Sequence, residues 1–153
     1  MIEIFRIIDS HFTGEAFSGK GAEIAGGRFN SSGLRVVYTS GSLSLAMLEL
    51  LVQVDDKHSL IGHIFVPAFI DRKHIEIIEE GDLPAGWDSL PFGSASQEFG
   101  DRWLAEQRSL ILQIPSIVVP RESNFLINPL HSSFDKIEFG VPEAARFDVR
   151  LVD

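Results

Sequence analysis

The sequence has 153 residues, 44% of them apolar, and carries a formal charge of −9 with a pI near 4.9. This length and composition are enough to bury a core, and we expect one domain spanning residues 1–153. The acidic balance argues against nucleic acid or an anionic membrane as the main direct partner, because both favour clustered lysine and arginine.

The chain opens with residues 2–8, whose alternation predicts a β-strand with apolar side chains on both faces. Arg6 interrupts one face, so it either emerges at a sheet edge or points into a cleft as a cation. The opening residues lack the basic and then apolar order of a signal peptide, and no apolar run reaches membrane-spanning length. We therefore expect a cytoplasmic protein.

Residues 9–34 contain six glycines and little periodicity, which predicts a long loop. Gly26, Gly27 and Gly33 lack a Cβ, so something can approach this backbone closely. Arg28 stands among them, and its planar fork of donors suits phosphate or carboxylate. The alternative for Arg28 is an ordinary surface arginine in a hairpin loop.

The next segment predicts a short strand, residues 36–39, and then an apolar helix, residues 42–54, capped by Ser42. Apolar residues on most sides of this helix predict that it is buried nearly all round. Glu49 is its only ionisable side chain, and a buried carboxylate needs a cation, hydrogen-bond donors or a ligand. A structural ion pair is the alternative role for Glu49.

Beyond the helix, the pattern predicts further strands and one more helix. The expected strands are 59–69, 74–79, 110–114, 134–139 and 147–152, and the expected helix is 94–106. Residues 81–93 are expected to be irregular. Pro115 and Pro120 mark a strand edge or kink, and Asn128-Pro129 signals a turn.

Strands outnumber helices in this prediction, and the two helices do not alternate with strands as βαβ units require. The expected class is α+β with mixed or antiparallel sheets and a few helices. Cysteine is absent, the five histidines lack metal-site spacing, and neither a Gly-x-Ser-x-Gly elbow nor a phosphate-binding loop occurs. We expect no metal and no cofactor.

Four ordered blocks together resemble the RES domain family, which is named for its Arg, Glu and Ser positions. The blocks are Gly-Gly-Arg-Phe-Asn around Arg28, Val-Val-Tyr-Thr-Ser around Tyr38, Leu-Ala-Met-Leu-Glu-Leu-Leu around Glu49, and Ile-Pro-Ser followed by Asn-Phe-Leu-Ile-Asn-Pro-Leu-His up to residue 131. Phe5-Arg6-Ile7 also resembles the opening strand of the family. Phe29 stands where the family often has Trp.

The resemblance implies a fold similar to ADP-ribosyltransferases and a bacterial toxin that degrades NAD, paired with a small Xre-like antitoxin. The antitoxin would cover the site and bind operator DNA, and a homodimer within the complex is possible. By position, Arg28, Tyr38 and Glu49 match the family's catalytic residues. The serine is assigned to Ser116, with Ser123 as the alternative. Substrate-binding roles are expected for Arg6, Asn30, Ser116 and Asn128.

Cleavage of the nicotinamide N-glycosidic bond passes through an oxocarbenium-like state, so the site must hold the diphosphate and stabilise positive charge on the ribose. Arg28 would bind phosphate, Glu49 would stabilise the ribose, and Tyr38 would orient the nicotinamide or ribose. Water would give a glycohydrolase and inorganic phosphate a phosphorylase. The alternatives are ADP-ribosyl transfer to a protein and a non-catalytic domain that only binds a partner.

Overall fold

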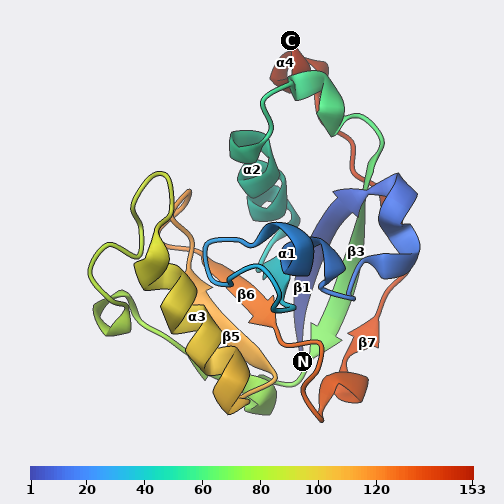
Figure 1. Ribbon diagram of the computed structural model, residues 1–153. Coiled ribbons are helices and arrows are strands. Elements are labelled where there is room, and N and C mark those ends of the chain that lie inside the picture. The colour runs from blue at the N-terminus through green and yellow to red at the C-terminus, as the bar shows by residue number, and fades with distance from the viewer.

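The computed structural model describes residues 1–153, which form one mixed sheet with helices packed around it (Figure 1). The strands are β1 (Ile2–Asp9), β2 (Val37–Ser40), β3 (His63–Ile70), β4 (Ile75–Ile77), β5 (Ile111–Pro115), β6 (Ser123–Ile127), β7 (Glu138–Phe139) and β8 (Glu143–Ala144). The α-helices are α1 (Lys20–Ala25), α2 (Leu43–Gln53), α3 (Ser94–Glu106) and α4 (Val149–Val152). Short 3-10 helices are η1 (Ser10–Glu15), η2 (Lys57–Leu60), η3 (Arg72–His74), η4 (Glu80–Asp82) and η5 (Phe134–Lys136). The expected α+β class with a mixed sheet is confirmed.

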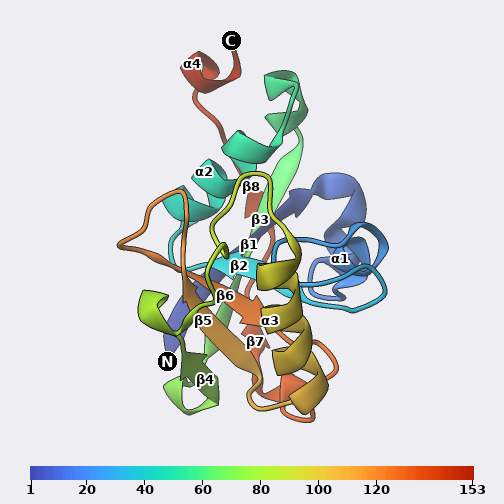
Figure 2. The same ribbon diagram turned by 60° about the vertical axis from the view of Figure 1, so that its left-hand side comes forward.

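The strand order is β4-β5-β6-β2-β1-β3-β7, and β8 also pairs with β3. All neighbours are antiparallel except β4 and β5, which are parallel and are joined through α3. This connection is a single βαβ crossover, which the sequence analysis did not expect. In Figure 2, α3 lies across β5 and β6 and covers that face of the sheet.

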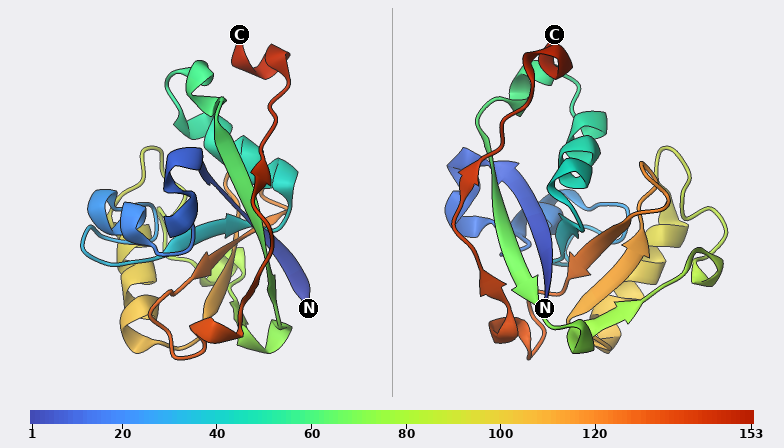
Figure 3. Two further views of the ribbon diagram at one scale, coloured as in Figure 1. Left: turned by 90° about the vertical axis from the view of Figure 1, so that its right-hand side faces the viewer. Right: turned by 180° about the vertical axis from the view of Figure 1, so that it is seen from behind.

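The sheet bends sharply at β2. Every residue of β1 pairs with β3, whereas β1 and β2 share only the pair Phe5 and Ser40. All four residues of β2 pair with β6 instead. The β1 and β3 half therefore diverges from the β5 and β6 half, and α2 lies in the angle between them (Figure 3).

Alternating side chains divide the core into two clusters on opposite faces of the sheet. One cluster contains Ile4, Val37, Ala68, Ile70, Leu110, Ile111, Phe125, Ile127 and Ile137. The other lies beneath α3 and contains Phe29, Val36, Leu83, Trp87, Trp103, Leu104, Leu112, Ile114 and Leu126. The second cluster includes residues from two loops, around positions 29 and 87, so core packing fixes those loops beside the sheet.

The predicted helix at 42–54 forms as α2, and Ser42 caps it by accepting a hydrogen bond from the Leu45 N–H at 3.1 Å. The expectation that this helix is buried nearly all round is wrong. Only Leu45 and Ala46 are buried, while Leu48 is 39% and Val52 61% exposed. One side of α2 faces away from the sheet and has no layer to pack against, so its apolar residues are exposed.

Four further expectations are corrected. The segment 9–34 is not one loop, since it contains η1 and α1, and two glycines with positive φ, Gly19 and Gly26, flank α1. Residues 134–139 form η5 and only a two-residue strand. The expected strand at 147–152 is absent, and Val149–Val152 form the short helix α4, because the Asp148 side chain accepts the Arg150 N–H and starts a helical turn. The predicted strand 59–69 begins later, at His63.

No helix in the structure is both long enough and apolar enough to cross a membrane.

Candidate active site

Glu49 projects from α2 toward the end of β5 and the start of β6. Its Oε2 accepts a hydrogen bond from the Ser116 hydroxyl at 3.3 Å and another from the Asn124 side-chain amide. The carboxylate therefore has two neutral donors and forms no ion pair within 4.0 Å. This arrangement leaves Glu49 without a cation, and the structural ion pair considered as its alternative role is absent.

Ser116 directly follows Pro115, the last residue of β5, and begins the turn that leads to β6. Its Oγ accepts the N–H groups of Val118 and Val119, at 3.0 and 3.1 Å, while its hydroxyl hydrogen is directed to Glu49. The side chain is 1% exposed. Ser123 instead accepts a hydrogen bond from Gln113 at 3.1 Å and does not contact Glu49. Of the two candidate serines, the structure brings Ser116 to the carboxylate.

Asn124 is the residue that the sequence analysis missed. It faces Ser40 across the β2 and β6 pair, and its Oδ1 accepts the Ser40 hydroxyl at 2.8 Å. This bond fixes the amide orientation that presents Nδ2 to Glu49. In the sequence, Asn124 is a polar residue directly before the apolar run of β6, on the face shared with Leu126, but its role depends on the strand register.

Arg28 lies in the glycine-rich loop, but its Nη1 donates to two carbonyl oxygens, those of Trp87 and Ser89, each at 2.9 Å. Its guanidinium carbon also lies 5.8 Å from the centre of the Phe92 ring. Burial lowers the pKa of Arg28, and the negative charges of Glu49 and Asp88 oppose that shift. The charge of Glu49 therefore acts on Arg28, although the two side chains form no ion pair. The two hydrogen bonds of Arg28 hold the loop that precedes α3 in place.

Tyr38 supports the Arg28 loop from β2. Its hydroxyl accepts the Phe29 N–H at 3.0 Å and donates to Asn30 Oδ1 at 2.6 Å. Gly27 permits this approach, because a Cβ there would lie 2.6 Å from the Tyr38 hydroxyl. Burial raises the pKa of the phenol well above its ordinary value, and the hydrogen bond from Phe29 opposes that shift. Tyr38 is therefore protonated and fully hydrogen-bonded.

Asn30 is the buried centre of the same loop. Its Nδ2 donates to the carbonyl oxygens of Ala22, Leu34 and Ser31, at 2.9, 3.0 and 3.2 Å. With its Oδ1 bonded to Tyr38, every group of this side chain is already used. These bonds give Asn30 a structural role in the loop, and its contact with substrate stays a prediction.

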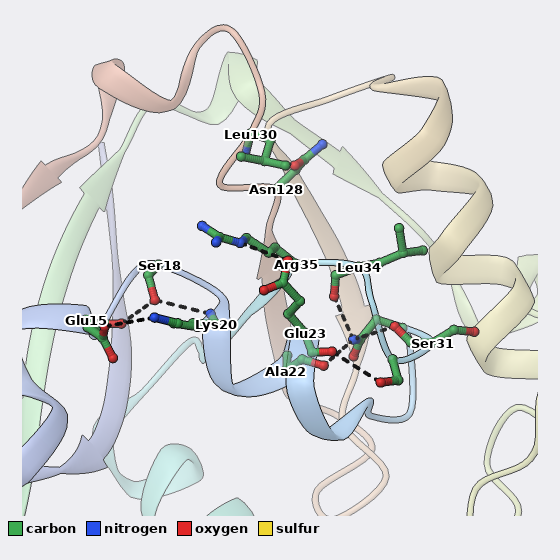
Figure 4. Close-up of polar contacts among 12 residues, drawn as sticks. Glu15, Ser18, Lys20, Ala22, Glu23, Ser31, Leu34, Arg35, Asn128 and Leu130 are labelled. Carbon is green, nitrogen blue, oxygen red and sulfur yellow. Dashed lines mark hydrogen bonds and ion pairs between the residues drawn. The ribbon is translucent and has the colours of Figure 1, made fainter.

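Asn128 forms no hydrogen bond with Glu49, Ser116 or Asn124. Its Oδ1 accepts the Leu130 N–H at 3.1 Å and closes the turn that follows β6 (Figure 4). Its backbone N–H donates to Leu110 at 2.9 Å. The asparagine beside the carboxylate is thus Asn124, and Asn128 organises the predicted turn.

Arg6 points toward the place where β1 and β2 diverge. Its Nε donates to the Ala16 carbonyl at 3.0 Å and its Nη1 to the Tyr38 carbonyl at 3.4 Å, while Nη2 has no protein partner. Burial lowers the pKa of Arg6 to about 10, so the group is still a cation at neutral pH. It has no carboxylate partner. The structure brings Arg6 to the backbone of Tyr38 but not into contact with Glu49.

A pocket of about 160 Å³ opens beside Ser116. Its lining residues come mainly from the loop before α3 and from the turn after β5. The pocket is lined by Glu80, Trp87, Asp88, Leu90, Pro115, Ser116, Ile117 and Pro120. No group of three or more His, Cys, Asp or Glu side chains is placed to hold a metal ion.

Comparison with known families gives a match to the RES domain over residues 3–148. The chain belongs to the RES domain family. It is 36% identical to the protein named Toxin Res of Yersinia enterocolitica, covering 97% of this chain and 98% of that one. It is 34% identical to the protein named Prs ADP-ribosylating toxin of a Sphingobium species, covering 92% and 89%.

A solved structure, the MbcT–MbcA toxin–antitoxin complex of M. tuberculosis, contains a chain similar to this RES domain with a TM-score of 0.75. The similarity covers 94% of this chain and 84% of that chain at 15% identity. At that identity the likeness shows that the fold is shared.

Proposed function

We propose that this protein is the toxin of a toxin–antitoxin pair and that it consumes NAD by breaking the nicotinamide N-glycosidic bond. Full-length relatives named Toxin Res and Prs ADP-ribosylating toxin support the general class. The observation that carries the chemical proposal is Glu49, held by Ser116 and Asn124 without a cationic partner. No ion pair occupies this carboxylate, so it is available to interact with a cationic ribose.

Each side chain has a part in this scheme. Glu49 accepts a ribose hydroxyl and stabilises the oxocarbenium character that develops as the bond breaks. Ser116 and Asn124 orient the carboxylate. Arg6 and Arg28 provide positive charge for the diphosphate through donors that the protein leaves free. Tyr38 is a positioning residue, because its hydroxyl acts through the loop that carries Arg28.

The test is incubation of the purified protein with NAD alone, followed by mass spectrometry with and without inorganic phosphate. We expect free nicotinamide, with ADP-ribose formed from water or a phosphorylated ADP-ribose formed from phosphate. Glu49→Gln, which keeps the shape and removes the charge, should reduce turnover by at least a hundredfold. Normal turnover by a folded Glu49→Gln protein would refute the proposal.

The second candidate is ADP-ribosyl transfer to a protein, which the name of the Sphingobium relative favours. It would use the same side chains for the same bond cleavage. Turnover that begins only when a protein acceptor is added would support transfer and exclude the glycohydrolase and phosphorylase reactions.

We also propose a basic antitoxin as the partner. The structurally similar chain is part of a toxin–antitoxin complex. The formal charge of −9 on the present chain would attract a partner with a positively charged surface. Co-expression with the adjacent gene should relieve growth inhibition if that gene encodes the antitoxin. Unrelieved inhibition would argue against that gene product as the partner.

A further inference from the structure

The pocket beside Ser116 has the size and position to hold one part of a substrate. A cavity of about 150 Å³ in another protein accommodates benzene, and this pocket measures about 160 Å³. It is therefore large enough for one six-membered ring. Ser116 lines the pocket and also donates to Glu49, so a ring bound there would lie next to the proposed catalytic carboxylate.

The lining of the pocket is negatively charged. Glu80 and Asp88 supply two carboxylates, neither of which forms an ion pair, and no Lys, Arg or His belongs to the lining. Arg28 is a nearby cation, but it is not a lining residue, and its Nη1 donates to the carbonyl oxygens of Trp87 and Ser89. Trp87 adds an indole ring to the wall, and an aromatic ring attracts a cation over its face.

We propose that this pocket receives the positively charged nicotinamide ring of NAD, and that Asp88 and Glu80 select this oxidised form over the neutral ring of NADH. The inference rests on the proposed function and extends it to the charge of the ligand. When the bond between the ribose carbon and the ring nitrogen breaks, the nitrogen keeps the electron pair and nicotinamide leaves as a neutral molecule. Water or phosphate supplies the oxygen of the new bond, and the proton of water passes to solvent. Loss of the ring's charge removes its attraction to both carboxylates and favours release of nicotinamide.

The test compares the KM for NAD with the inhibition constant of NADH in Asp88→Asn, Glu80→Gln and the double variant. A single exposed charge pair is worth a few-fold in affinity. Each single variant should therefore raise the KM for NAD about threefold, and the double variant about tenfold. NADH inhibition should stay constant, so the ratio of the two constants should fall by those factors.

Glu98→Gln is the matched control, because it removes the same charge from an exposed position on α3, where Glu98 makes no side-chain hydrogen bond or ion pair. Thermal melting checks that all variants fold. An unchanged ratio in the double variant, or equal changes for NAD and NADH, would overturn the inference while NAD turnover by the wild-type protein upheld the proposed function. Absence of nicotinamide release by the wild-type protein would instead refute the proposed function.

Discussion

The carbonyl oxygen of Phe29 occupies the space that a side chain at Gly100 would need. A Cβ built on Gly100 would lie 1.8 Å from that oxygen, far inside van der Waals contact. The backbone of α3 therefore packs directly against the loop that carries Arg28. Glycine weakens a helix by its intrinsic propensity, but here its missing side chain brings the helix and the loop together.

Gly100→Ala should force α3 away from the Arg28 loop and lower the free energy of unfolding by about 3 kcal/mol, at the upper end of overpacking effects. Urea unfolding followed by far-UV circular dichroism measures this change. Gly21→Ala is the control, since a Cβ at Gly21 in α1 meets nothing within 4 Å. That substitution should be neutral or slightly stabilising. Equal stability of the two variants would contradict the packing described here.

The titration of Tyr38 offers a direct test of its burial. It is the only tyrosine in the chain, so absorbance at 295 nm reports this phenol alone. Because burial raises its pKa, the folded protein should show no phenolate near pH 10, whereas the urea-unfolded chain should titrate there. The unfolded state then releases this proton first, so the contribution of Tyr38 to the free energy of unfolding should be constant below pH 10 and fall above it. Titration of the folded protein near pH 10 would contradict this environment.

The local parts of this fold follow from sequence patterns, and the long-range parts do not. A serine cap and helical periodicity predict α2, and alternation predicts β1, because both signals lie within a few neighbouring residues. The exposure of Val52 depends on the bend of the sheet at β2, which no local pattern encodes. Asn124 reaches Glu49 because the β2 and β6 register places it opposite Ser40, 84 positions away.

The candidate site divides in the same way. The sequence indicates Glu49 as a candidate because it is the one ionisable residue of an apolar helix. It indicates Arg28 because this cation lies among glycines. Arg28 holds the Trp87 loop only because an irregular segment about 60 positions away packs beside it. Local sequence patterns do not predict that contact. Asn30 and Asn128 resemble ligand-binding residues in sequence, yet each hydrogen-bonds to a nearby backbone, as asparagine often does in turns.

The two candidate serines should respond differently to truncation. Ser116→Ala leaves the N–H groups of Val118 and Val119 without their acceptor and removes a donor to Glu49. We expect a loss of about 2 kcal/mol in the free energy of unfolding, the cost of buried unsatisfied groups, and at least a tenfold loss of NAD turnover. Ser123→Ala removes one hydrogen bond to Gln113 and should cost about 1 kcal/mol or less, with turnover retained. Urea unfolding and nicotinamide release measure both effects, and an equal loss of turnover in Ser123→Ala would contradict the assignment of Ser116.

Arg28 should control the loop before α3, and tryptophan fluorescence can report it. The chain has two tryptophans. Trp103 is fully buried, and Trp87, in the Arg28-bound loop, is 7% exposed. Arg28→Ala removes both hydrogen bonds to the loop carbonyls and should make Trp87 accessible, which acrylamide quenching of the fluorescence detects. Arg28→Lys should restore part of the protection, because an ammonium group also donates to carbonyl oxygens.

Arg108→Ala is the matched control for this experiment, since it also removes an arginine but breaks only surface ion pairs with Glu76 and Glu106. Its quenching should equal that of the wild-type protein. If Arg28→Ala abolished NAD turnover while quenching stayed at the wild-type level, Arg28 would act on the substrate alone. Increased quenching together with a raised KM, partly reversed in Arg28→Lys, would instead show that its hold on the Trp87 loop shapes the pocket.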